Sequence, residues 1–405
     1  MNSNDYIDLD KSYGARIYKP LDIVVERAEG AWLYDVEGKR YLDGLSAYSA
    51  VNQGHAHPRL QRAMSEQMSR VTLTSRAFRN DQMGLFLQDL CELMGYDLAL
   101  PMNTGAEAVE TAIKAARKWG YQRKNIPQGQ AEIIVFDGNF HGRTTTIVGF
   151  SSEAQYRQDF GPFAPGFVSV PYGDLQAVEA AITVNTAAVL IEPIQGEAGV
   201  VIPPRGFLKG LEETCQANNV LLLADEIQSG LGRAGGLTAS GREGVRADMV
   251  ILGKALSGGF YPVSAVVADK EILGLFRAGD HGSTYAGNPL GAAIAREALA
   301  IMLDENLIQR SRSLGKHALE ALQGLEHSSI KEVRGRGLFI AIELSEPARP
   351  YCEALAERGL LCKETHQNVI RFAPPLVIKE EELEWALEQF KDVFAAEIVR
   401  EKVSA

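Results

Sequence analysis

Cysteine is scarce in this sequence, and its scarcity argues against a disulfide framework. Four cysteines occur in 405 residues: Cys91, Cys215, Cys352 and Cys362. They are scattered and form no Cys-x-x-Cys pattern, which is typical of reduced thiols in a cytoplasmic protein. The N-terminus is polar and acidic, unlike a signal or transit peptide. The sequence therefore predicts a cytoplasmic location.

Basic residues and long apolar runs are lacking too. The net charge is -11, with no basic run, and this excludes the usual footprint of a nucleic-acid-binding protein. No apolar run is long enough to cross a bilayer. The chain does contain 46% hydrophobic residues, 23% charged residues and 39 glycines. Together with its length, this composition is typical of an α/β enzyme with two domains.

The order of predicted elements indicates a mostly parallel sheet. Strand, helix and strand alternate from about residue 100 to 270, which implies a sheet covered on both faces. After a long helix at 290–303, helices and strands alternate again and predict a smaller α+β domain, ending in a helix from 380 to about 398. The first 30 residues are interpreted as an arm with a short helix, followed by a hairpin and then a loop at 46–54.

Lys254 closes a buried strand predicted at 249–252. An amine in that position is costly unless it is paired, neutralised or used covalently. It could reach out to solvent along its apolar stem. Alternatively it could form a Schiff base with an aldehyde cofactor, because a desolvated amine loses its proton readily and becomes nucleophilic.

Asp225 ends a second buried strand, at 220–225, and favours the cofactor interpretation. Ligands of α/β sheets bind at the carboxyl ends of the strands, so Asp225 and Lys254 are predicted to face one crevice. Pyridoxal phosphate requires such a pair: a lysine on its aldehyde carbon and an aspartate at its ring nitrogen.

Two loops add possible ligand contacts. Thr104, Gly105 and Ala106 stand at a predicted helix start, where free amides and the helix dipole favour a phosphate; a simple threonine N-cap is the alternative. Phe140 and Arg143 follow a strand, where the ring could stack on a cofactor and the arginine could bind a carboxylate. An exposed loop arginine is the alternative there.

Three other features are weaker. Arg371 lies in a strand at 369–372 and needs an acidic partner, from the protein or from a substrate. His55 and His57 lack further metal ligands, so no metal site is predicted. The G-x-G-x-x-G pattern at 230–235 matches a dinucleotide fingerprint, but it does not follow its strand directly and opens no good helix.

Together these motifs resemble the class III pyridoxal-phosphate aminotransferases of fold type I, over nearly the whole chain. The stretches that carry the resemblance are 49–55, 100–105, 192–201, 252–259 and 370–379. The resemblance implies an α/β fold: a large domain with a mostly parallel seven-stranded sheet, plus a smaller α+β domain. The expected division is an arm and hairpin at 1–40 belonging to the small domain, the cofactor-binding domain at 41–290, and the C-terminal small domain at 291–405.

The resemblance also implies roles around the cofactor. Lys254 would form the Schiff base and carry a proton, and Asp225 would pair with the ring nitrogen. The remaining cofactor contacts would come from Thr104, Gly105, Ala106, Phe140, His141, Ile227, Gln228, Ser283 and Thr284. Phe140 and Ile227 would cover the two ring faces, and Gln228 would reach the ring hydroxyl. Ser283 and Thr284 would reach the phosphate of a neighbouring subunit, so the site would need at least a homodimer.

Within the family, the chain is most similar to the branch that moves the δ-amino group of ornithine to 2-oxoglutarate. Arg371 would then bind the α-carboxylate of the oxo-acid and Arg143 its distal carboxylate. Glu197 would pair with Arg371 while ornithine reacts. Tyr18 and Tyr48 would hold the α-carboxylate and α-amine of ornithine.

Alternatives to this activity remain open. His141 stands where animal members of the ornithine branch carry tryptophan, so another ω-aminotransferase, acting on acetylornithine, 4-aminobutyrate or lysine, is the nearest alternative. A racemase or mutase would not need the charged set of Arg143, Glu197 and Arg371. A binding protein that had kept the fold would not need Lys254.

Overall fold

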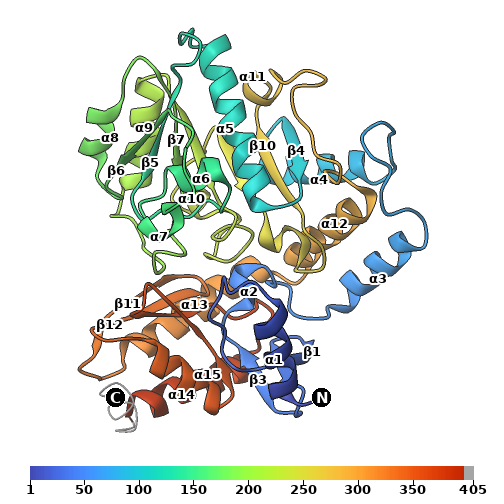
Figure 1. Cartoon of the computed structure of the whole chain (residues 1–405), viewed down its shortest axis with the longest axis vertical. Coiled ribbons are helices and arrows are strands. Elements are labelled where there is room, and N and C mark those ends of the chain that lie inside the picture. The colour runs from blue at the N-terminus through green and yellow to red at the C-terminus, as the bar shows by residue number, and fades with distance from the viewer. Residues whose placement is uncertain (396–405) are drawn as a thin grey trace.

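The computed structural model describes residues 1–395, so the last three residues of the helix predicted at 380–398 lie outside the described part. Figure 1 shows two bodies: an upper one built on a large sheet, and a lower one that contains the N-terminal residues and the helix at 380–395. Within the described residues, no helix is both long and apolar enough to cross a membrane.

The upper body is built on a seven-stranded sheet in the order β4-β10-β9-β8-β7-β5-β6. Only β10 runs antiparallel to its neighbours, so the predicted mostly parallel sheet is confirmed. The strands are β4 (Leu98–Met102), β5 (Glu132–Phe136), β6 (Phe167–Val170), β7 (Thr186–Ile191), β8 (Leu221–Asp225), β9 (Met249–Leu252) and β10 (Ser264–Ala268).

Apolar packing covers both faces of this sheet. Along β7, Val189 and Ile191 belong to one hydrophobic cluster, while Ala188 and Leu190 belong to another. A strand buried on both faces needs no polar alternation, which explains its continuous apolar run. The surrounding helices are α5 (Gly105–Gln122), α6 (Thr145–Gly149), α7 (Ala154–Arg157), α8 (Leu175–Ala181), α9 (Phe207–Ala217), α10 (Ala239–Arg242), α11 (Lys270–Leu273) and α12 (Pro289–Asp304).

The lower body brings the two ends of the chain together. The predicted hairpin is present, and Leu42 of its second strand pairs in parallel with Leu360. The strands are β1 (Val25–Glu29), β2 (Trp32–Asp35), β3 (Arg40–Asp43) and β13 (Leu360–Leu361) in one sheet, and β11 (Ile330–Arg336), β12 (Phe339–Leu344), β15 (Val369–Phe372) and β14 (Lys363–Thr365) in another. The division of the chain at residues 40 and 290 stays a prediction.

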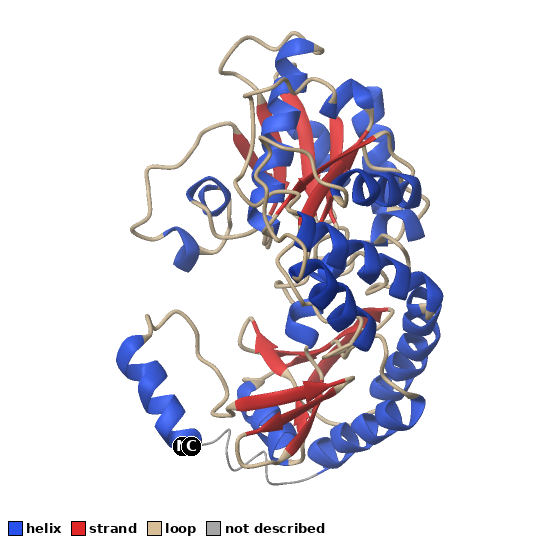
Figure 2. Cartoon of the chain, turned by 90° about the vertical axis from the view of Figure 1, so that its right-hand side faces the viewer, coloured by secondary structure: helices blue, strands red, loops and turns tan. Residues whose placement is uncertain are grey.

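Helices complete the lower body and its links to the sheet above. They are α1 (Ser3–Tyr13), α3 (Pro58–Met68), α4 (Met83–Met94), α13 (Leu307–Gln323), α14 (Arg349–Glu357) and α15 (Glu380–Ala395). Helix α1 has no buried residue, and Figure 2 shows it to one side on an extended segment, consistent with the predicted arm.

One segment differs from the sequence prediction. The loop predicted at 46–54 contains a short helical turn, α2 (Ser46–Ser49), in which all four residues have positive φ, between 46° and 71°. Residues other than glycine rarely form such a turn, because a left-handed conformation costs about 1–2 kcal/mol per residue. Local sequence therefore could not predict it.

Candidate active site

Lys254 and Asp225 lie at the carboxyl edge of the large sheet, on neighbouring parallel strands. Asp225 ends β8 and pairs with Ile251 of β9, and Lys254 begins the short 3-10 helix η1 (Lys254–Ser257) just beyond β9. Lys254 has a φ of 44°, a left-handed conformation directly after Gly253. Burial lowers the pKa of Lys254, opposed by the nearby carboxylates Glu197 and Asp225. The two strand-end residues are thus close enough to interact electrostatically, as the sequence predicts.

Asp225 is held by a buried histidine. His141 Nδ1 lies 2.7 Å from Asp225 Oδ2, and the two side chains are 0% and 4% exposed. Burial opposes protonation of His141, but the hydrogen bond and charge of Asp225 prevail and raise its pKa. His141 thus provides a buried polar partner for the Asp225 carboxylate. Asp225 Oδ1 also accepts a hydrogen bond from the Ile227 amide, at 3.1 Å.

A third buried ionisable group, Glu192, lies beside this pair. Its carboxylate accepts hydrogen bonds from the amides of Phe140, at 2.9 Å, and Gly196, at 3.3 Å. Burial raises the pKa of Glu192 to about 7, which His141 partly offsets. Glu192 thereby fixes the backbone that precedes His141.

The start of α5 has the geometry of a phosphate site. Thr104 is its N-cap, in a capping box with Glu107, so the N-cap interpretation is confirmed. Within the described residues, the next two amides, of Gly105 and Ala106, have no hydrogen-bond partner. A Cβ on Gly105 would lie 3.0 Å from Ile227 Cδ1, so the helix start and the loop after β8 form a narrow space.

Ser283 lies beside this helix start in its own chain. Its hydroxyl accepts from Asn103 Nδ2 at 2.9 Å and donates to Glu107 Oε1 at 3.0 Å. Thr284 is exposed and its side chain has no hydrogen bond to any described residue. A phosphate contact across a subunit boundary stays a prediction for both residues.

Arg371 has the acidic partner that the sequence requires. Its Nη1 donates to Glu197 Oε1 at 2.9 Å, to Gln228 Oε1 at 3.0 Å and to the Gly196 carbonyl at 3.2 Å. Burial opposes ionisation of Glu197, but Arg371 prevails and lowers its pKa. Within the described part of the chain, Nη2 and the buried Nε of Arg371 have no hydrogen-bond partner. These two nitrogens form the edge of a guanidinium that binds carboxylates bidentately.

The other predicted substrate residues lie at the outer end of this group. The Tyr48 ring lies 4.7 Å from Arg371 Cζ, and Tyr18 is near enough to influence the pKa of Tyr48, which burial raises. Arg143 is exposed and its Cζ lies 3.9 Å from the centre of the Tyr156 ring. Among the described residues, no carboxylate pairs with Arg143. Arg143 is therefore a cation without a counter-charge, oriented by an aromatic ring that sequence reasoning missed.

These features fit pyridoxal phosphate. They supply an amine whose pKa is lowered by burial, a carboxylate paired with His141, and two free amides at a helix start. Over residues 13–394 the sequence matches the class-III aminotransferase family. The chain belongs to the class-III aminotransferases. Class-III aminotransferases are pyridoxal-phosphate enzymes, so the predicted cofactor and fold type are confirmed.

Class-III aminotransferases of known name cover almost the full chain. An ornithine aminotransferase of Brevibacillus brevis is 58% identical over 391 residues, covering 96% of this chain and 98% of that protein. The solved ornithine aminotransferase of Toxoplasma gondii has a TM-score of 0.97 and 41% identity, covering 100% of this chain and 96% of its own. An acetylornithine aminotransferase structure from Elizabethkingia anophelis has a TM-score of 0.89 and 45% identity, covering 98% and 99%.

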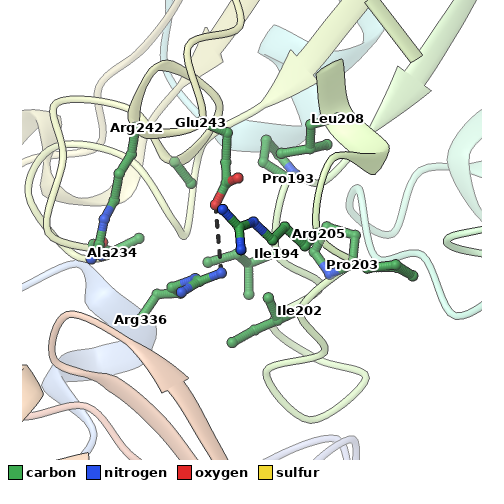
Figure 3. A pocket seen from close by; sticks show the side chains of 12 residues that line it. Pro193, Ile194, Ile202, Pro203, Arg205, Leu208, Ala234, Arg242, Glu243 and Arg336 are labelled. Atoms are coloured by element: carbon green, nitrogen blue, oxygen red, sulfur yellow. Dashed lines mark hydrogen bonds and ion pairs between the residues drawn. The ribbon is translucent and has the colours of Figure 1, made fainter. Parts of the chain in front are cut away.

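A pocket outside this residue group lies between the segment after β7 and the end of β11. It has a volume of about 20 Å³, enough for roughly one water molecule, so it cannot take an amino acid. The pocket is surrounded by Arg205, Arg242 and Arg336. Arg336 Nη2 lies 3.5 Å from Glu243 Oε1, and a dashed line marks this ion pair in Figure 3. None of the predicted site residues lines this pocket.

His55 and His57 pair with separate carboxylates. His55 Nε2 lies 2.7 Å from Asp43 Oδ2, and His57 Nε2 lies 3.0 Å from Glu305 Oε1. Each ring thus has a local structural partner.

Proposed function

We propose that this aminotransferase moves the δ-amino group of L-ornithine to 2-oxoglutarate. The products are glutamate 5-semialdehyde, which cyclises to pyrroline-5-carboxylate with loss of water, and glutamate. The relatives named ornithine aminotransferase support this activity. The structural observation that carries it is the Arg371–Glu197 pair, because the two substrates place opposite demands on that arginine.

Lys254 and Asp225 serve the chemistry in this proposal. Bound pyridoxal phosphate supplies an aldehyde that takes up the amino group and a ring that withdraws electrons from the reacting carbon. Lys254 Nζ, whose pKa is lowered by burial, takes the proton from that carbon and later returns one. Asp225, held in place by His141, accepts the hydrogen bond of the ring nitrogen. Gly105 and Ala106 donate their amides to the phosphate, and Phe140 and Ile227 cover the ring.

Arg371 must act differently in the two halves of the reaction. The carbon that carries the δ-amine has no carboxylate, so a free arginine beside it would be an uncompensated buried charge. Glu197 neutralises it. With 2-oxoglutarate, Glu197 moves away and the Nε–Nη2 edge of Arg371 binds the α-carboxylate, while Arg143 binds the distal one. Tyr18 and Tyr48 hold the α-carboxylate and α-amine of ornithine.

Glu197 can leave without breaking the hydrogen bonding of Arg371. Nη1 has two hydrogens and three acceptors, and two of these acceptors, Gln228 Oε1 and the Gly196 carbonyl, remain when Glu197 departs. Only charge compensation is then lost, and an incoming carboxylate restores it. This makes the exchange of partners inexpensive.

A complete site would be shared between subunits in a homodimer, with Thr284 contributing to the phosphate of the partner, and the enzyme would work in the cytoplasm. Sedimentation of the purified protein tests the dimer. A monomer with full activity would contradict the shared site.

A visible absorption spectrum tests the substrate pair. The long-wavelength band of the bound cofactor should bleach on addition of L-ornithine and return on addition of 2-oxoglutarate. Acetylornithine is the second candidate, because a neighbour of known structure carries that name. Bleaching by acetylornithine or 4-aminobutyrate, but not by ornithine, would leave the cofactor chemistry intact and overturn the ornithine assignment.

A further inference from the structure

Arg233 is a fully buried arginine with no carboxylate partner among the described residues. Its Nη1 donates to the carbonyls of Leu338 and Pro374, both at 2.7 Å. Its Nη2 donates to Asn52 Oδ1 at 2.5 Å and to Ser46 Oγ at 3.3 Å. Burial lowers the pKa of Arg233 to about 9, which the charge of Asp43 partly offsets. A buried cation whose hydrogen bonds reach no carboxylate is costly, so its four acceptors on three separate segments call for an explanation.

One of these segments is the left-handed turn α2. Ser46 opens the turn and its hydroxyl donates to the Ala373 carbonyl at 2.6 Å. Asn52 follows the turn, and its carbonyl accepts from the Leu376 amide at 2.8 Å. Four successive residues with positive φ persist only where surrounding contacts determine them. Arg233 supplies two of these contacts, one at each side of Tyr48.

The second segment carries Arg371. Pro374 follows β15, the strand that contains Arg371, and Arg233 binds its carbonyl. The third segment is the turn before β12, bound at Leu338, and β12 pairs with β15 so that Ala341 faces Arg371. One guanidinium thus joins the turn that presents Tyr48 to the strand that presents Arg371, whose Cζ lies 4.7 Å from the Tyr48 ring.

The glycines around Arg233 make this burial possible. Gly232 and Gly235 have φ of +95° and +74°, which favour glycine. A Cβ on Gly337 would lie 2.6 Å from the Arg233 carbonyl and 2.5 Å from the Gly235 nitrogen. The G-x-G-x-x-G pattern at 230–235 is therefore explained by a loop that folds tightly around Arg233, and not by a dinucleotide.

We propose that Arg233 is a positioning residue for substrate recognition. It never contacts the substrate. It holds Tyr48, which binds the α-carboxylate and α-amine end of ornithine together with Tyr18, in a fixed position relative to Arg371, which binds the oxo-acid. Its planar fork reaches acceptors in several directions, which a lysine ammonium on a flexible stem does not reproduce. This inference rests on the proposed ornithine activity and adds a residue to it.

The test compares two substrates that differ only in the recognised group. L-ornithine and 1,4-diaminobutane, which is ornithine without its carboxylate, are each mixed with the holoenzyme, and bleaching of the cofactor band gives the rate of the amine half-reaction. Arg233→Lys and Asn52→Ala should lower the ornithine rate at least tenfold relative to the diamine rate. Arg312→Lys is the matched control, because Arg312 donates to the Gly235 carbonyl at the edge of the same loop, at 3.0 Å, and should leave the ratio unchanged.

The outcomes separate the two proposals. If the wild-type enzyme does not prefer ornithine to the diamine, the proposed function fails. If it does, and both rates fall together in the variants with an unchanged ratio, Arg233 is only structural and the inference is wrong. Should Arg233→Lys fail to fold, Asn52→Ala and Ser46→Ala each remove one acceptor and decide the question.

Discussion

The inner and outer ends of the proposed site are built differently. At the inner end, His141 and Asp225 are 0% and 4% exposed and pair with each other at 2.7 Å. At the outer end, Glu197 is 23% exposed, Arg143 is exposed, and Arg371 Nη1 has three acceptors. The two inner side chains have each other as partners, as a cofactor that is the same in both half-reactions requires. The outer group offers alternative partners, as two different substrates require.

Replacing Lys254 should have the largest effect on turnover, because it removes the reacting amine at the inner end of the site. Lys254→Ala removes the proton-carrying amine, and loss of a positioned acid–base group lowers turnover by at least about 10²–10⁴-fold. Steady-state turnover of ornithine with 2-oxoglutarate measures the effect, and the exposed Lys270→Ala serves as a control. Turnover within tenfold of wild type would show that another group carries the proton.

Asp225→Asn should have the next largest effect. It keeps the shape at the end of β8 but removes the charge that His141 stabilises, and loss of one preorganised electrostatic contact costs about 10²–10³-fold in kcat. Both half-reactions should slow by a similar factor, because both use the same ring nitrogen. Stopped-flow rates for each half-reaction check this. If only one half-reaction slowed, Asp225 would not play the same role in both.

Glu197→Ala should act on the outer end alone. Without its carboxylate, Arg371 stays uncompensated until a substrate carboxylate binds, so glutamate should react more readily and ornithine less readily. We expect the ornithine-to-glutamate rate ratio to fall by about 10–100-fold, a fraction of the roughly 3–5 kcal/mol that breaking a buried pair costs. The exposed Glu213→Ala on α9 is the control. An unchanged ratio would reject the exchange of partners.

Glu192→Gln should act on stability rather than on a reaction rate. The pKa of Glu192 is raised from 4.5 to about 7, so the folded state binds more protons than the unfolded state between these values. The free energy of unfolding therefore falls as pH rises from about 4.5 to 7, by about 3 kcal/mol in total. Glutamine does not titrate, so the variant should not show this fall in the free energy of unfolding. The thermal midpoint of the variant should therefore rise relative to that of the wild type between pH 5 and pH 8. A difference that does not change with pH would contradict a raised pKa of Glu192 in the folded protein.

Local sequence predicted the inner end well and the outer end poorly. Asp225 and Lys254 follow apolar runs long enough to identify buried strands, and parallel strands bring their ends together. Arg233 gave no such signal, because its acceptors lie on segments that meet only in the folded chain. The left-handed turn at Tyr48 depends on these same distant contacts. The family resemblance assigned Tyr48 a role, but not the conformation that presents it.

The pairing of β3 with β13 has a consequence for how the chain is made. Leu42 meets Leu360, so 318 residues (360 minus 42) separate the two partners. At roughly 5–20 residues per second, a ribosome needs about 16–64 s to cover that distance. Throughout this time the first-made hairpin exposes an unpaired strand edge, and a hairpin alone is marginally stable in water. The part of the protein that is synthesised first is thus completed among the last.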